Sequence, residues 1–95
     1  VLEAAHIRSY AEGGPHAVQN GMLLKADLHI LFDAGYVTVT DDHHVEVSRR
    51  LHDDFDNGRD YFRLHGKKLE TLPESEAERP AKEFLLWHRE ERYVG

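Results

Sequence analysis

The sequence predicts a small α+β domain, with two strands and a short helix first, then a β-hairpin and a C-terminal helix. A chain of 95 residues is long enough for one domain with one small core. Apolar, strand-like runs at 2–7 and 21–25 flank a stretch rich in Gly and Pro. Alternating β-branched residues at 36–40 and 45–48 add a second pair of strands.

The first half of the chain predicts a strand, a long loop, a second strand and a helix. The strands are expected at 2–7 and 21–25, and Gly, Pro and Asn residues between them indicate the loop. A helix over 28–34 follows, because its apolar residues recur at helical spacing. Asp27 is expected to cap this helix at its start and Gly35 at its end.

The second half predicts a hairpin and a closing helix. Residues 36–40 and 45–48 pair across a polar turn, and a short helix is expected over 49–57. A C-terminal helix is expected in the second half of 75–93, with Pro80 near its first turn. Its apolar anchors are Phe84, Leu85 and Trp87, and packing is a better explanation of Trp87 than base stacking.

Composition limits the function classes. Hydrophobic residues make up 40% and charged residues 32% of the chain, which is typical of a globular protein. There is no cysteine, so disulfides and thiolate zinc sites are excluded, and no apolar run is long enough to cross a membrane. The net charge of −6 argues against gripping nucleic acid by bulk electrostatics unless a bound cation or a basic partner domain contributes.

The strand–loop–strand–helix unit is punctuated by four polar residues, His6, Asn20, His29 and Asp33. Asp33 follows His29 by four residues, which places both on one helical face where imidazole and carboxylate can share a cation. Phosphodiester hydrolysis needs a base for the attacking water, a cation for the developing charge and a group that orients the base. The four residues supply a group for each task.

These motifs resemble those of HNH endonucleases with the ββα-metal fold, and most closely the bacterial restriction-type branch. The resemblance is carried by Glu3-Ala-Ala-His-Ile7, Gly13-Gly14, Asn20-Gly-Met-Leu-Leu24 and Asp27-Leu-His-Ile-Leu-Phe-Asp33. It implies that His6 is the general base and that Asn20 orients the base and braces the loop. It implies that His29 is a metal ligand and that Asp33, one turn on, is a further one.

One position departs from the family pattern. Many members carry Asp or His directly before the catalytic His, as a metal ligand, whereas this chain has Ala5. Water would then complete the coordination, and Glu3 is the nearest carboxylate along the strand. The resemblance implies a divalent metal, with Mg²⁺ favoured and Mn²⁺, Ni²⁺ and Zn²⁺ as alternatives.

Structural explanations compete with each functional assignment. His6 could be a satisfied core histidine, Asn20 a turn residue before a glycine, and His29 with Asp33 a plain surface pair. Arg8, directly after the expected strand, is the better candidate for a nucleic-acid phosphate contact. Arg49 and Arg50 could contact phosphate or only face solvent, and the histidines outside the motif are left unassigned.

We therefore expect residues 1–95 to form one HNH nuclease domain, the C-terminal part of a longer protein, cutting DNA with a metal ion. DNA versus RNA, the recognition site, an upstream DNA-recognition domain and a homodimer stay open. Two rivals are a degenerate HNH domain that binds metal or DNA without cutting and a protein-interaction module with a structural metal.

Overall fold

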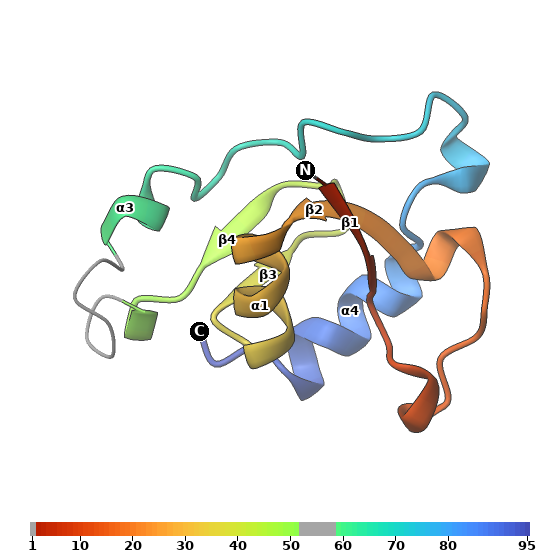
Figure 1. Cartoon of the computed structure of the whole chain (residues 1–95), viewed down its shortest axis with the longest axis horizontal. Helices are drawn as coiled ribbons and strands as arrows, with labels where there is room; N and C mark the ends of the chain where they lie inside the picture. The colour runs from red at the N-terminus through yellow and green to blue at the C-terminus, as the bar shows by residue number, and fades with distance from the viewer. Residues whose placement is uncertain (1, 52–58) are drawn as a thin grey trace.

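The computed structural model describes residues 2–51 and 59–95, and it opens with a β-hairpin (Figure 1). Strand β1, Leu2–His6, pairs antiparallel with β2, Gly21–Lys25. The register places Leu2 opposite Lys25 and His6 opposite Gly21. Two single turns of 3-10 helix, η1 (Tyr10–Glu12) and η2 (Val18–Asn20), lie in the connecting loop. The predicted strand–loop–strand order is confirmed.

Helix α1, Ala26–Ala34, follows β2 without a linker. The expectation that Asp27 caps it is wrong, because the helix begins earlier and Lys25 occupies the N-cap position. Asp27 lies in the first turn, where its Oδ1 accepts a bond from the Leu28 amide. The prediction that Gly35 caps the end of this helix is confirmed. Gly35 adopts the left-handed conformation with φ 88°, and its N–H bonds back into the last turn.

The second predicted hairpin is confirmed, with shorter strands. Strand β3, Val37–Val39, pairs antiparallel with β4, Val45–Val47. All residues of β3 are buried, so this strand lies inside the protein rather than at a wet surface. Most of the short helix expected over 49–57 lies outside the described residues. The next described helix is α3, Arg59–Phe62.

The C-terminal helix forms in the second half of 75–93, as predicted. Helix α4 spans Lys82–Glu91, and only a 3-10 turn, η3 (Glu76–Glu78), forms before it. Pro80 explains why no helix continues from η3, because a proline disfavours helical geometry in the residue before it. Arg79 is accordingly extended, with φ −73° and ψ 157°.

Helix α1 holds the domain together. It contacts β1, β2 and β3, and α4 packs against β3 (Figure 1). Phe32 of α1 and Leu85 of α4 are both almost fully buried, at 0% and 1% exposure. The apolar faces of the two helices and the second hairpin therefore form one core.

Within the described part of the chain, no helix is long and apolar enough to cross a membrane.

A buried histidine joins the two helices. The His88 ring of α4 stacks on Phe32, with ring centroids 3.6 Å apart. Its Nε2 lies 2.8 Å from the Phe32 carbonyl oxygen and its Nδ1 lies 2.8 Å from Thr38 Oγ1. A carbonyl can only accept, so Nε2 carries the proton and Nδ1 accepts from the threonine hydroxyl. With a neutral imidazole, both ring nitrogens of His88 and the hydroxyl of Thr38 are therefore hydrogen-bonded.

His88 makes the fold sensitive to acid. Burial lowers the pKa of His88 below its ordinary 6.5, although the Phe32 carbonyl and Asp33 partly offset the effect. The unfolded chain therefore binds the proton more readily, so the contribution of His88 to stability is complete above about pH 6.5 and is lost as the pH falls toward the folded-state pKa. We expect the free energy of unfolding to fall by at most about 1.4 kcal/mol per pH unit in this window on account of His88. Urea titrations of the wild type and His88→Gln should show a shallower pH dependence in the variant, and equal slopes would contradict this role.

Candidate nuclease site

His6 lies at the end of β1, where the strand gives way to the loop. It is exposed, whereas its neighbours Ala5 and Ile7 are 1% and 3% exposed and belong to the core. Alternate strand residues point to opposite faces, so the burial of these neighbours turns the imidazole outward. The explanation of His6 as a satisfied core histidine is therefore wrong.

His6 shares a surface cleft of about 440 Å³ with His29 and Asp33. The imidazoles come from β1 and α1, and the carboxylate lies one turn further along α1. Trp87 and Arg92 of the C-terminal region line the same cleft. Three of the four motif side chains thus line one surface that solvent can reach.

Asn20 is the fourth, and it lies beneath this surface with 0% exposure. Its amide Nδ2 donates to the carbonyl oxygens of Arg8 (2.8 Å) and Pro15 (2.9 Å), and its Oδ1 accepts from the Arg8 amide at 2.9 Å. Its backbone carbonyl also accepts from the Ile7 amide at 2.9 Å. Asn20 therefore closes the loop that leaves His6, as expected for a brace rather than for a group that meets substrate.

Gly14 is needed for the same closure. A Cβ at Gly14 would lie 1.8 Å from the Arg8 carbonyl oxygen and 2.9 Å from Asn20 Nδ2. Gly21 is different, because a Cβ there would meet backbone oxygens only at ordinary contact distances of 3.6 and 3.7 Å. Of these two glycines, only Gly14 lies where the loop packs backbone against backbone.

We expect Gly14→Ala to lower both the free energy of unfolding, by about 1–3 kcal/mol, and any activity that depends on His6. The added methyl group would push the Arg8 carbonyl away from Asn20. Gly21→Ala is the matched control and should lie within about 1 kcal/mol of the wild type. Thermal and urea unfolding measure both. A Gly14→Ala protein as stable as Gly21→Ala would contradict the tight closure.

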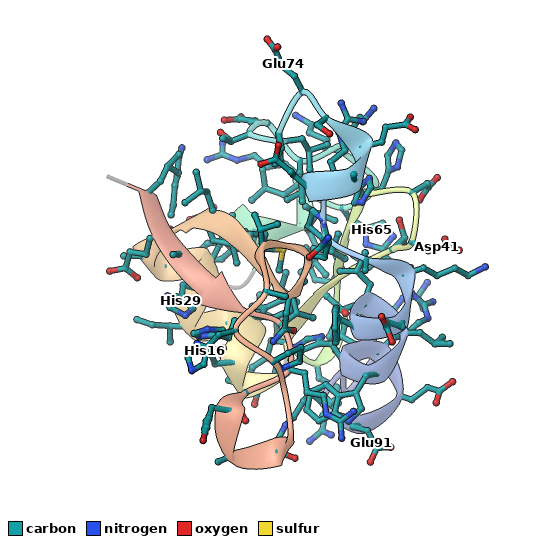
Figure 2. All side chains as sticks on the ribbon, turned by 90° about the vertical axis from the view of Figure 1, so that its right-hand side faces the viewer. His16, His29, Asp41, His65, Glu74 and Glu91 are labelled. Atoms are coloured by element: carbon teal, nitrogen blue, oxygen red, sulfur yellow. The ribbon has the colours of Figure 1, made fainter. Side chains whose placement is uncertain are left out.

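His29 lies between two carboxylates. Its Nδ1 is 2.9 Å from Glu3 Oε1, and its Nε2 is 3.3 Å from Asp33 Oδ2. The histidine side chain is 26% exposed, and Glu3 and Asp33 are 47% and 62% exposed. In the view of Figure 2, His29 on α1 and His16 of the loop lie on the same side. The i,i+4 pair is thus part of a three-residue contact rather than an isolated surface pair.

The donor chemistry of this group fits a hard or borderline divalent cation. An imidazole and two carboxylates are ordinary ligands for such ions, and Glu3 lies on the same strand face as Ala5, two residues away. In the arrangement seen here the carboxylates face opposite ring nitrogens. Correspondingly, the described residues contain no ready-made cluster of three His, Cys, Asp or Glu ligands. Either carboxylate can share a cation with His29, with water completing the shell.

Several residues of the site were not predicted. The His16 ring lies edge-on to His6, with centroids 5.6 Å apart, and stacks on Tyr10. Arg92 and Trp87 enter the cleft from the C-terminal region. Arg8, predicted to bind nucleic acid, is half-buried and bonds through Nε to the Glu12 carbonyl oxygen at 2.7 Å. No spacing in the sequence signals contacts that depend on how the last helix packs.

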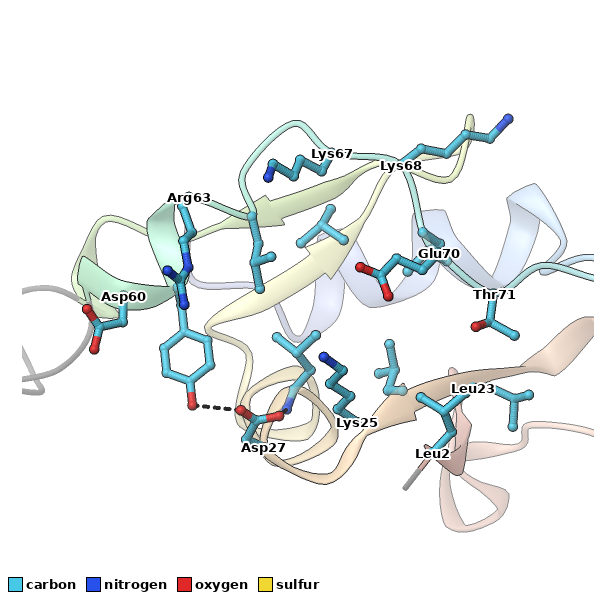
Figure 3. Close-up of a pocket in the computed structure, with 16 residues that line it drawn as sticks. Leu2, Leu23, Lys25, Asp27, Asp60, Arg63, Lys67, Lys68, Glu70 and Thr71 are labelled. Atoms are coloured by element: carbon cyan, nitrogen blue, oxygen red, sulfur yellow. Dashed lines mark hydrogen bonds between the residues drawn. The ribbon is translucent and has the colours of Figure 1, made fainter.

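A second cavity of about 440 Å³ lies between the first hairpin and residues 60–71 (Figure 3). Leucines line it together with basic and acidic side chains. Tyr61 donates from its hydroxyl to Asp27 at 3.0 Å, and burial together with this carboxylate raises the tyrosine pKa. This cavity is distinct from the candidate site, because neither His6 nor His29 lines it and its lining carries charges of both signs.

Comparison with known proteins supports the motif. Residues 1–40 match the family model described as HNH endonuclease. The resemblance to HNH endonucleases is thus confirmed. The HNH match spans β1, the loop, β2, α1 and β3, which includes the cleft residues His6, His29 and Asp33.

The fold extends the likeness beyond the HNH motif. The structure is similar to a solved structure titled "Modification dependent TagI restriction endonuclease", with a TM-score of 0.64 and 23% identity. The match covers 99% of this chain and 28% of that chain. The predicted α+β fold is confirmed by this likeness. No curated protein matches the chain.

Proposed function

We propose that this chain is the catalytic domain of a metal-dependent endonuclease that hydrolyses phosphodiester bonds of DNA. The observation that carries the proposal is the cleft that holds His6 beside His29 and Asp33. This hydrolysis requires a base and a bound cation, and the cleft offers an exposed imidazole and a histidine–carboxylate pair whose chemistry suits a cation. The HNH match over the same residues supports the reaction type.

In this proposal His6 removes a proton from the water that attacks phosphorus. Asn20 and Gly14 keep the start of the loop in one conformation, so the imidazole meets the water without a conformational search. His29 and Asp33 would hold the divalent cation, with Glu3 in reach of His29. When bound, that cation supplies Lewis-acid stabilisation of the charge that develops on the phosphate.

Ligand chemistry supports the choice of metal ion, and the similar solved structure supports a restriction-type role. Mg²⁺ fits a site with carboxylate ligands and several waters, and Mn²⁺, Ni²⁺ and Zn²⁺ are the alternatives. The structural neighbour is titled a restriction endonuclease and is much longer than this chain, which supports a restriction-type role with an additional DNA-recognition domain. A homodimer would allow both strands of a duplex to be cut.

The test is incubation of the purified chain with supercoiled plasmid, linear duplex DNA and RNA, each with one divalent metal or with EDTA. We expect metal-dependent nicking of the plasmid. Cleavage of RNA alone would overturn the DNA assignment, and cleavage in EDTA would overturn the metal requirement.

A degenerate HNH domain that binds metal or DNA without cutting is the second candidate. Ala5 in place of a ligand and the net charge of −6 favour it. Manganese binding, measured by electron paramagnetic resonance, together with no turnover on any of the three substrates would support this candidate.

A further inference from the structure

Arg92 lies at the C-cap of α4 and lines the same cleft as His6, His29 and Asp33. Its guanidinium lies over the Trp87 ring, with Cζ 5.7 Å from the ring centroid. Its backbone is fixed as well, because its amide bonds to the His88 carbonyl at 2.9 Å. A Cβ at Gly35 would lie 2.1 Å from the Arg92 carbonyl oxygen, so the ends of α1 and α4 are in close backbone contact. Arg92 is therefore held at a set position relative to His29 and Asp33.

The guanidinium of Arg8 also lies over the Trp87 ring. Arg8 Cζ lies 5.3 Å from the Trp87 centroid, so the indole contacts both cations. Glu12 pairs through its carboxylate with Arg92 and through its backbone carbonyl with Arg8 Nε. Among the described residues no carboxylate pairs with Arg8, which leaves two guanidinium charges for one carboxylate. Asp33 also lines the cleft, so the excess of positive charge is confined to the two guanidinium groups around Trp87.

We propose that Arg92 binds a phosphate of the nucleic-acid substrate in the cleft, and that Glu12 occupies the guanidinium until the substrate arrives. The proposal rests on the proposed nuclease function. A guanidinium binds carboxylate and phosphate with the same forked geometry, so a carboxylate partner at 36% exposure is open to exchange. Trp87 helps to position Arg92, because the guanidinium lies over its ring.

An alternative is that the Arg92–Glu12 pair only fastens the loop to α4. The two explanations predict opposite changes in DNA binding when the charge of Glu12 is removed. If the pair is a fastener, removal of either partner has the same effect, a weaker fold and weaker DNA binding. If Arg92 binds phosphate, removing Arg92 weakens binding, whereas removing the charge of Glu12 strengthens it.

The experiment measures binding of a fluorescent duplex by anisotropy between 0.05 and 0.3 M salt, in EDTA, for Arg92→Gln and Glu12→Gln. The helix offers a matched pair, because Arg89 and Glu46 also form an ion pair and neither lines the cleft. We expect Arg92→Gln to weaken binding roughly tenfold at 0.1 M salt and to reduce the slope of log K against log salt by about one. Glu12→Gln should tighten binding severalfold, and Arg89→Gln and Glu46→Gln should each change it less than about twofold.

Two results would overturn the proposal. One is loss of binding in both Arg92→Gln and Glu12→Gln with lowered melting temperatures, and the other is an unchanged salt slope in Arg92→Gln. Plasmid nicking by the wild type is measured in parallel. Nicking with an unchanged salt slope would remove only the role of Arg92, whereas neither binding nor nicking by the wild type would remove the nuclease function as well.

Discussion

Replacing His6 by alanine is expected to lower plasmid cleavage by about 10²–10⁴-fold and to leave the fold intact. A positioned general base contributes about that much to a hydrolysis rate. The His6 side chain is exposed, so its removal opens no cavity in the core. Single-turnover cleavage of supercoiled plasmid measures the rate, and circular dichroism and thermal melting check the fold.

His16→Ala is the matched control for that experiment. His16 is also an exposed imidazole, and its ring lies 5.6 Å from the His6 ring, centroid to centroid. We expect it to change the rate far less than His6→Ala does. If His16→Ala abolished cleavage and His6→Ala did not, the base would be His16 and the assignment would be wrong.

Replacing Asn20 by alanine is expected to cost about 2–4 kcal/mol of the free energy of unfolding and to impair cleavage. The side chain is fully buried, and its loss leaves the Arg8 amide and the carbonyls of Arg8 and Pro15 without their partner. Urea unfolding measures the stability. Gln19→Ala is the control, since Gln19 makes one exposed bond to the Ala77 carbonyl, and should cost less than about 1 kcal/mol.

Asn20→Asp separates the amide from the shape of the side chain. The carboxylate has nearly the same size, but it would face the carbonyl oxygens of Arg8 and Pro15 without a proton to donate. At neutral pH we expect this variant to be at least as unstable as Asn20→Ala. Lowering the pH should narrow its difference from the wild type, because a protonated carboxyl can donate one bond. A variant as stable as the wild type at pH 7 would contradict the bracing role.

Local patterns predicted most of the elements. Alternating Val and Thr residues indicated β3 and β4, and Gly35 marked the end of α1. The error is at the start of α1. Asp27 resembles an N-cap, but α1 begins directly from β2.

The site was predictable only where its residues lie in one motif. His6, Asn20, His29 and Asp33 fall within one strand–loop–strand–helix unit, so local spacing brings them together. Arg92 reaches the cleft only because α4 packs on the second hairpin, and such packing leaves no spacing signal along the chain.

His88 shows the same limit in the core. Its partner Thr38 is 50 residues away, so nothing in the local sequence distinguished this buried histidine from a surface one.

The proposed cleavage of DNA at the His6 cleft requires a divalent cation. Its most direct test is a time course of plasmid nicking in Mg²⁺, stopped with EDTA and then restarted with excess Mg²⁺. We expect nicking to halt with the chelator and to resume with the metal, and we expect no measurable nicking by His6→Ala under either condition. Nicking that continues through EDTA, or that proceeds equally in His6→Ala, would contradict it.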